Sequence, residues 1–97
     1  MGMSENEATP PPASFELLIA SFIMQAQVQL GMLRMPGSEQ EETKPNLAWA
    51  KHTIDLLAVI EEKTKGNLAL EEKRILENSL TELRFRYVQA LTAEEKK

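Results

Sequence analysis

The segment 15–33 constrains the fold more than any other part of this sequence, because it is long, nearly uncharged and apolar on two sides. It reads FELLIASFIMQAQVQLGML, and after Glu16 no charged residue occurs before Arg34. At 100° per residue, its apolar side chains form two stripes on opposite sides of a helix. Such a helix must be covered on both sides. We therefore expect the rest of the chain to cover one stripe and a second copy to cover the other.

The two stripes differ in their predicted roles. The first stripe is expected in the core and holds Phe15, Leu18, Ile19, Phe22, Ala26, Leu30 and Leu33. The second stripe is the predicted self-association surface and holds Leu17, Ala20, Met24, Val28 and Gly31. Its small residues would let two helices approach closely. In a competing arrangement, the second helix covers this stripe within one chain by using Trp49, Leu56 and Ile60.

The 97 residues are enough for one domain with a thin core. Runs of valine, isoleucine and threonine that alternate with polar residues do not occur, so no half-buried strand is predicted. The sequence instead predicts an all-α, three-helix protein, in which helices two and three form an antiparallel hairpin and dimerisation covers helix one. We expect helices at about 14–34, 45–65 and 69–91, after a disordered arm at 1–13 and before a charged tail at 92–97.

Residues typical of helix ends set these boundaries. Ser14 precedes the first apolar residue, where its hydroxyl can accept a hydrogen bond from the first turn. Pro36 disfavours helical geometry in the residue before it, so helix one is expected to end near 33–35, before a loop at 36–44. Pro45 is compatible with the first position of helix two.

The reversal between helices two and three has a recognisable chemistry. Lys63 and Lys65 complement the negative end of a helix dipole, and Gly66 can adopt a positive φ. Leu68 can then fold back on the preceding turn. We therefore assign the structural turn to Lys63, Lys65, Gly66, Asn67 and Leu68.

Composition excludes some classes of function. The sequence has no cysteine, which removes disulfides and thiolate catalysis and fits a cytoplasmic location. The net charge of −4 argues against wholesale phosphate binding. The apolar segment is close to the length of a membrane span, but Gln25, Gln27 and Gln29 would lie at mid-membrane depth. We expect no membrane span.

No constellation of residues indicates catalysis. No nucleophile lies beside a base, and the four glycines are too scattered for a phosphate-binding loop. His52 and Asp55 share one helical face, but two ligands do not make a metal site. We therefore expect no enzyme activity, no cofactor and no metal.

The sequence leaves two functions open. The first is a noncatalytic interaction protein, a homo-oligomer that presents a helical surface to a protein partner. Phe85 and Val88 lie opposite the predicted core stripe of helix three, and with Arg84 and Arg86 they form the predicted partner surface. The alternative is a nucleic-acid-associated module with a basic patch of Lys63, Lys65, Arg84 and Arg86.

Three stretches of the sequence resemble a known family. They are AKHTIDLL at 50–57, EKTKGNL at 62–68 and LRFRYV at 83–88, and segment 15–33 resembles the family's first helix. The chain is similar to the bacterial domain-of-unknown-function family 1844. This resemblance implies a small, cytoplasmic, all-helical bacterial protein without an assigned activity or catalytic residue. The family often has Ser or Thr where this chain has Ala69, which leaves Asn67 as an alternative helix cap.

Overall fold

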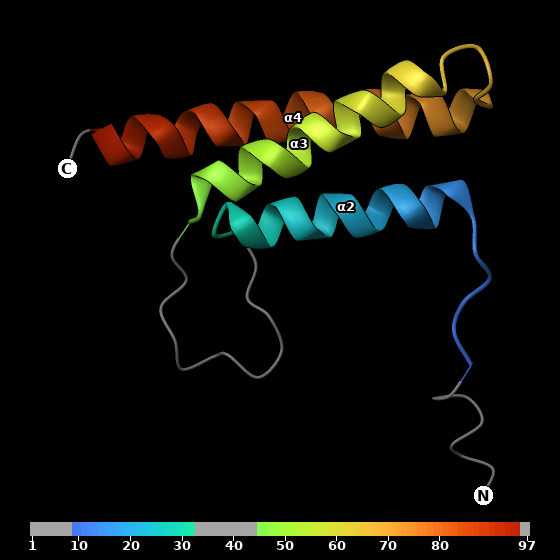
Figure 1. Ribbon diagram of the computed structural model, residues 1–97, viewed down its shortest axis with the longest axis horizontal. Coiled ribbons are helices and arrows are strands. Elements are labelled where there is room, and N and C mark those ends of the chain that lie inside the picture. The colour runs from blue at the N-terminus through green and yellow to red at the C-terminus, as the bar shows by residue number, and fades with distance from the viewer. Residues whose placement is uncertain (1–8, 33–44, 96–97) are drawn as a thin grey trace, which may run out of the picture.

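In the part of the chain that the structure describes, three α-helices pack on one another (Figure 1). The structure is a computed structural model that describes residues 9–32 and 45–95. The helices are α2 (Phe15–Gln29), α3 (Leu47–Lys63) and α4 (Leu70–Glu95). Helices α3 and α4 form an antiparallel hairpin, and α2 packs against both of them. The predicted all-α, three-helix fold is confirmed.

Several sequence-based predictions fall on residues outside the described ranges. The first part of the predicted arm, the loop at 36–44, Leu33 and the last two residues of the tail lie outside the described residues. In the part that is described, none of the helices is both long enough and apolar enough to cross a membrane.

Helix α2 begins as predicted but ends earlier. The Ser14 hydroxyl accepts a hydrogen bond from the backbone N–H of Leu17 at 3.0 Å. At the other end, Gly31 has a φ of +85° and Met32 N–H donates to the carbonyl of Gln27 at 2.8 Å. This is the glycine-dependent helix termination in which a left-handed residue lets the chain reverse over its last turn. The predicted end near 33–35 was wrong, because Gly31 stops the helix rather than weakening it.

Helix α3 begins two residues later than predicted. Asn46, not Pro45, is the residue before the helix, and its side chain accepts a hydrogen bond from Trp49 N–H at 3.3 Å. Pro45 therefore lies outside the helix instead of at its first position. An asparagine at this position satisfies an amide that the first turn leaves unpaired, which explains the later start.

The turn from α3 to α4 contains Gly66 with the positive φ that its sequence context predicts. That φ is +85°, and Asn67 N–H donates to the carbonyl of Thr64 at 2.9 Å. Helix α3 stops at Lys63, two residues before its predicted end, and the Thr64 hydroxyl donates to the carbonyl of Ile60 at 2.7 Å. Gly66 thus closes a turn beyond the helix and does not cap its last turn directly.

Helix α4 starts without a side-chain cap at its first position. Ala69 precedes the helix, and its N–H donates to the carboxylate of Glu72 at 2.9 Å. This is half of a capping box: Glu72 accepts from the N–H of the residue before the helix, and the hydroxyl half is missing at Ala69, so Asn67 is not the cap. The helix then extends to Glu95, beyond the predicted end at 91. No glycine or proline interrupts residues 92–95.

The core lies where the three helices meet. Its buried apolar side chains recur at helical spacing, three from or just after each helix: Ile19, Ala26, Leu30, Ala50, Ile54, Leu57, Leu76, Leu80 and Leu83. Part of the first stripe of α2 is therefore buried as predicted. Leu18 is the exception, because 48% of its surface is exposed.

A small polar cluster joins the end of α2 to the start of α3. Thr53 is fully buried, and its hydroxyl donates to Gln29 Oε1 at 2.6 Å. The backbone N–H of Asn46 donates to the carbonyl of Gln29 at 2.7 Å. These bonds hold the first turns of α3 beside the last turn of α2.

Candidate self-association and partner surfaces

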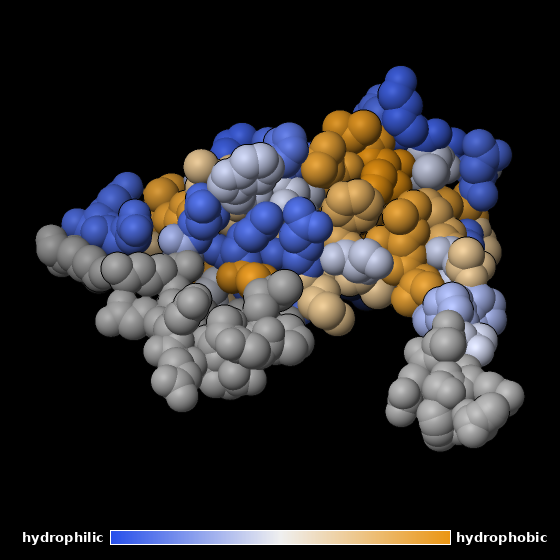
Figure 2. Space-filling view, turned by 60° about the horizontal axis from the view of Figure 1, so that its bottom comes forward, coloured by the Kyte–Doolittle hydropathy of each residue, from blue (hydrophilic) through white to orange (hydrophobic). Residues whose placement is uncertain are grey.

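The outer side of α2 carries a shallow apolar groove. Its volume is about 320 Å³, and its lining residues are Leu17, Ala20, Ser21, Met24, Gln25 and Val28. None of the six is charged. Figure 2 shows apolar side chains gathered on the side of the molecule that includes the first half of α2. The structure thus brings four of the five predicted self-association residues into one groove.

The groove is open because its neighbours do not cover it. Met24 is 58% exposed and Leu17 is 39% exposed. Trp49, which was expected to help cover this stripe in the competing arrangement, is itself 55% exposed. Figure 1 shows that α3 diverges from α2 toward the N-terminal end of α2. Within the described chain, α3 therefore leaves the second stripe of α2 uncovered.

Gly31, the fifth predicted self-association residue, lies apart from the groove. A side chain added at Gly31 would place its Cβ 3.5 Å from Cγ of Pro45. That distance is an ordinary van der Waals contact, so space alone does not require a glycine here. Its φ of +85° does, and Gly31 therefore serves the turn inside one chain.

The predicted partner surface on α4 is exposed. Phe85 and Val88 each have 57% of their surface open to water, and the charged side chains of Arg84 and Arg86 are exposed beside them. Arg86 Nε lies 2.9 Å from Glu82 Oε2, so Glu82 offsets part of the positive charge here. An exposed aromatic residue next to an aliphatic one is typical of a contact surface for a protein.

The four basic residues of the nucleic-acid alternative do not form one patch. Lys63 and Lys65 lie at the turn that precedes α4. At about 1.5 Å per residue, Arg84 is roughly 20 Å further along α4 from its start at Leu70. A phosphate backbone is bound by clustered lysines and arginines. The separation therefore gives no support to a basic interface made of these residues.

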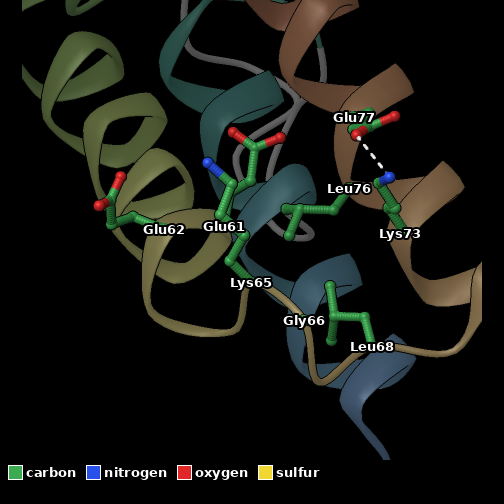
Figure 3. A pocket seen from close by; sticks show the side chains of 8 residues that line it. All are labelled: Glu61, Glu62, Lys65, Gly66, Leu68, Lys73, Leu76 and Glu77. Atoms are coloured by element: carbon green, nitrogen blue, oxygen red, sulfur yellow. Dashed lines mark ion pairs between the residues drawn. The ribbon is translucent and has the colours of Figure 1, made fainter.

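A second hollow lies where the α3–α4 turn meets both helices. Its volume is about 530 Å³. Figure 3 shows its lining residues, which are Glu61, Glu62, Lys65, Gly66, Leu68, Lys73, Leu76 and Glu77. Lys73 Nζ lies 3.9 Å from Glu77 Oε2. Carboxylates and ammonium groups are mixed, so the hollow presents no single sign of charge to a ligand.

A third hollow, of about 250 Å³, lies at the start of α3. Trp49, His52 and Ala48 line it, and the rings of Trp49 and His52 meet edge to face with centroids 5.4 Å apart. His52 is thus in contact with an aromatic ring. Across the described residues, no three acidic, histidine or cysteine side chains come together in a way that could hold a metal ion.

Sequence reasoning missed several residues of these surfaces. Gln25 was not among the predicted self-association residues, yet it lines the groove. Trp49 was expected to cover the second stripe of α2 in the competing arrangement, and it is exposed. The signal that could have been used for Trp49 is its position just after Asn46, because the first turn of a helix has neighbours on fewer sides than its middle.

A family model described as "Domain of unknown function (DUF1844)" matches residues 12–89. The chain belongs to the DUF1844 family. No curated protein and no solved structure matches this chain.

The DUF1844 match confirms the resemblance predicted from the sequence. The matched region also includes the surfaces described above. It includes all of α2 and α3 and most of α4. The α2 groove, the turn at Gly66 and the exposed pair Phe85 and Val88 therefore all lie in the DUF1844 region. The family description assigns no function, so function must be inferred from the surfaces themselves.

Proposed function

We propose that this DUF1844 protein is a noncatalytic interaction protein that self-associates through α2 and presents α4 to a protein partner. The observation that carries the proposal is the uncharged apolar groove on the outer side of α2. Burying apolar surface contributes about 25 cal/mol per Å², and a large side chain contributes about 1.5–3 kcal/mol when fully buried. A twofold contact between two copies hides Leu17 and Met24 of both chains at once.

A second copy fits the groove because the groove carries no charge. Two identical charged surfaces would repel, whereas two identical uncharged apolar surfaces do not. Ala20 and Ser21 are small and lie between larger side chains in the groove lining. They leave room for a side chain of the facing helix to enter.

The α4 surface is the proposed contact for a different protein. Phe85 and Val88 are exposed on the described chain, and neither belongs to the α2 groove. Aromatic residues and arginines are the residue types most often found at energetic centres of protein interfaces. The absence of cysteine from the sequence agrees with a cytoplasmic setting for this contact.

Sedimentation velocity tests the self-association step. We expect the doubly substituted Met24→Glu, Val28→Glu chain to sediment as a monomer, because each pairing would bury several unpaired carboxylates. A matched control is Phe85→Glu, Val88→Glu, which adds the same charge on α4 and should leave self-association unchanged. Loss of association in the control variant but not in the α2 variant would contradict the assignment.

Affinity capture from the native host tests the partner step. The wild-type chain and Phe85→Glu should each capture further copies of the chain, but a partner protein should be retained only by the wild type. A partner that binds both chains equally would contradict the role of α4. The nucleic-acid alternative predicts binding to RNA or DNA that weakens steeply with salt, and no binding at low salt would remove it.

A further inference from the structure

Two exposed apolar residues near the α2 groove are not part of its lining. Leu18 is 48% exposed at the start of α2, and Trp49 is 55% exposed at the start of α3. Leu18 was predicted in the core, and Trp49 was expected to cover the second stripe of α2 in the competing arrangement. Trp and Leu side chains left this open lose the stabilisation that burial provides. Their positions relative to α2 indicate what covers them.

Leu18 and Trp49 lie on the same flank of the groove. Leu18, Gln25 and Gln29 are spaced by seven and four residues, so they share one side of α2. Gln29 on that side accepts the hydrogen bond from Thr53 of α3. Trp49 precedes Thr53 by four residues and therefore shares the α2-facing side of α3. The flank toward α3 thus carries Leu18 at one end and Trp49 at the other.

A hydrogen bond between the chain segments of α2 and α3 shows near which end of α2 each of the two residues lies. Asn46 N–H donates to the carbonyl of Gln29, which places the start of α3 beside the end of α2. Trp49 therefore lies near the C-terminal end of α2. Leu18 lies near its N-terminal end, where α3 has diverged from α2 (Figure 1).

The groove alone is small for a stable interface. Such interfaces bury about 600–1,000 Å² on each partner. A helix of 15 residues is about 22 Å long and 10 Å wide, so its outer face covers on the order of 220 Å² in projection. A second copy must therefore also contact side chains that flank the groove. A tryptophan is among the largest contributors, because it can bury about 150–250 Å².

Twofold symmetry then decides how the copies pair. If the α2 helices run antiparallel, the symmetry operation exchanges the two ends of the groove but keeps each α3 flank on the same side. The C-terminal end of one α2 then faces the N-terminal end of the other, and Trp49 meets Leu18. If the helices run parallel, the α3 flanks lie on opposite sides and these residues do not meet. Antiparallel helix dipoles also attract one another.

We propose that two copies pair their α2 helices antiparallel, so that Trp49 of each copy packs on Leu18 of the other. This arrangement rests on the proposed self-association and adds its orientation and its two outer contacts. Because the pairing is isologous, the contact forms twice. It gives a role to both residues, which remain exposed among the described residues of a single chain.

Cross-linking of single cysteines tests the arrangement directly, because the natural sequence has no cysteine. The doubly substituted Leu18→Cys, Trp49→Cys chain should form a covalent dimer with a short bismaleimide. Chains that carry only Leu18→Cys or only Trp49→Cys should remain uncross-linked, whereas an equal mixture of the two should form a mixed covalent dimer. Val59→Cys is the matched control on the outer side of α3, and it should not cross-link to Leu18→Cys.

The outcomes separate this inference from the proposed function. A dimer by light scattering in which Trp49→Cys cross-links to itself contradicts the antiparallel pairing but leaves self-association in place. A chain that remains monomeric removes both. In the unsubstituted protein, the emission of the single tryptophan should shift to shorter wavelength as concentration drives association, and Trp49→Ala should weaken association about tenfold or more. Emission that stays constant while the mass doubles would contradict the contact.

Discussion

The two sides of α2 have similar side chains and different environments. Ile19 and Ala26 on the inner side are fully buried between α3 and α4, whereas Leu17 and Met24 on the outer side remain open to water. Helix propensity and hydrophobicity do not distinguish them. The number of helices does, because two further helices cover only one side of a third. The described helices leave the other side open, and this is the basis of the proposed function.

The largest effect should come from truncating the inner side. Ile19→Ala removes a fully buried side chain and should lower the free energy of unfolding by about 2–5 kcal/mol. Met24→Ala is the matched change on the outer side and should alter the stability of the single chain by less than about 1 kcal/mol. Urea denaturation followed by circular dichroism at low protein concentration measures both. Equal losses would show that the outer side is also packed within one chain.

The next effect concerns the two turns that end α2 and α3. Gly31 and Gly66 both have a φ of +85°, so alanine at either position should cost roughly 1–2 kcal/mol. A larger residue should affect the two positions differently. A Cβ at Gly31 would lie 3.5 Å from Cγ of Pro45, whereas no atom lies within 4 Å of a Cβ at Gly66. Gly31→Val should therefore lower the melting temperature more than Gly66→Val. An unchanged melting curve for Gly66→Val would contradict the turn.

A smaller effect tests the polar cluster between α2 and α3. Thr53→Val keeps the shape of the buried side chain but removes the hydroxyl that donates to Gln29. The loss should be about 1 kcal/mol, as measured by chemical denaturation. Thr81→Val changes an exposed threonine on α4 and serves as the control. A neutral Thr53→Val would mean that this bond does not hold α3 beside the groove.

The smallest effect is the exposed ion pair on α3. The carboxylate of Asp55 accepts a hydrogen bond from Lys51 at 2.9 Å, and this bond raises the pKa of Lys51 above its ordinary 10.5. Its stabilisation is therefore fully present below pH 10.5 and is lost as pH rises through the higher pKa of the folded state. Asp55→Asn should make the melting temperature less sensitive to pH in that alkaline range, with little change at pH 7.

Local chemistry made much of this fold predictable from the sequence. The Ser14 cap, the positive φ of Gly66 and the Lys51–Asp55 pair depend on residues within four positions of one another. The apolar spacing likewise identified the core side of α4. The sequence therefore predicted the three helices and the hairpin correctly.

The exposure of single residues was less predictable, because it depends on how far neighbouring helices diverge. Leu18 and Trp49 have apolar side chains on core-facing arcs, yet each lies near the margin of the contact between α2 and α3. Periodicity gives the side of a helix on which a residue lies but not the length over which a neighbour covers that side. The early end of α2 was missed for a related reason, since the hydrogen bond from Met32 to Gln27 that closes it requires Gly31 to adopt a positive φ.

The mass of the unsubstituted chain in solution tests the central claim most directly. Light scattering at tens of micromolar protein should give twice the chain mass of 10.9 kDa, because we propose that a second copy covers the uncharged outer side of α2. The mass should fall toward that of one chain on dilution, and Met24→Glu combined with Val28→Glu should give one chain at all concentrations. A wild-type mass of 10.9 kDa at tens of micromolar would contradict the account.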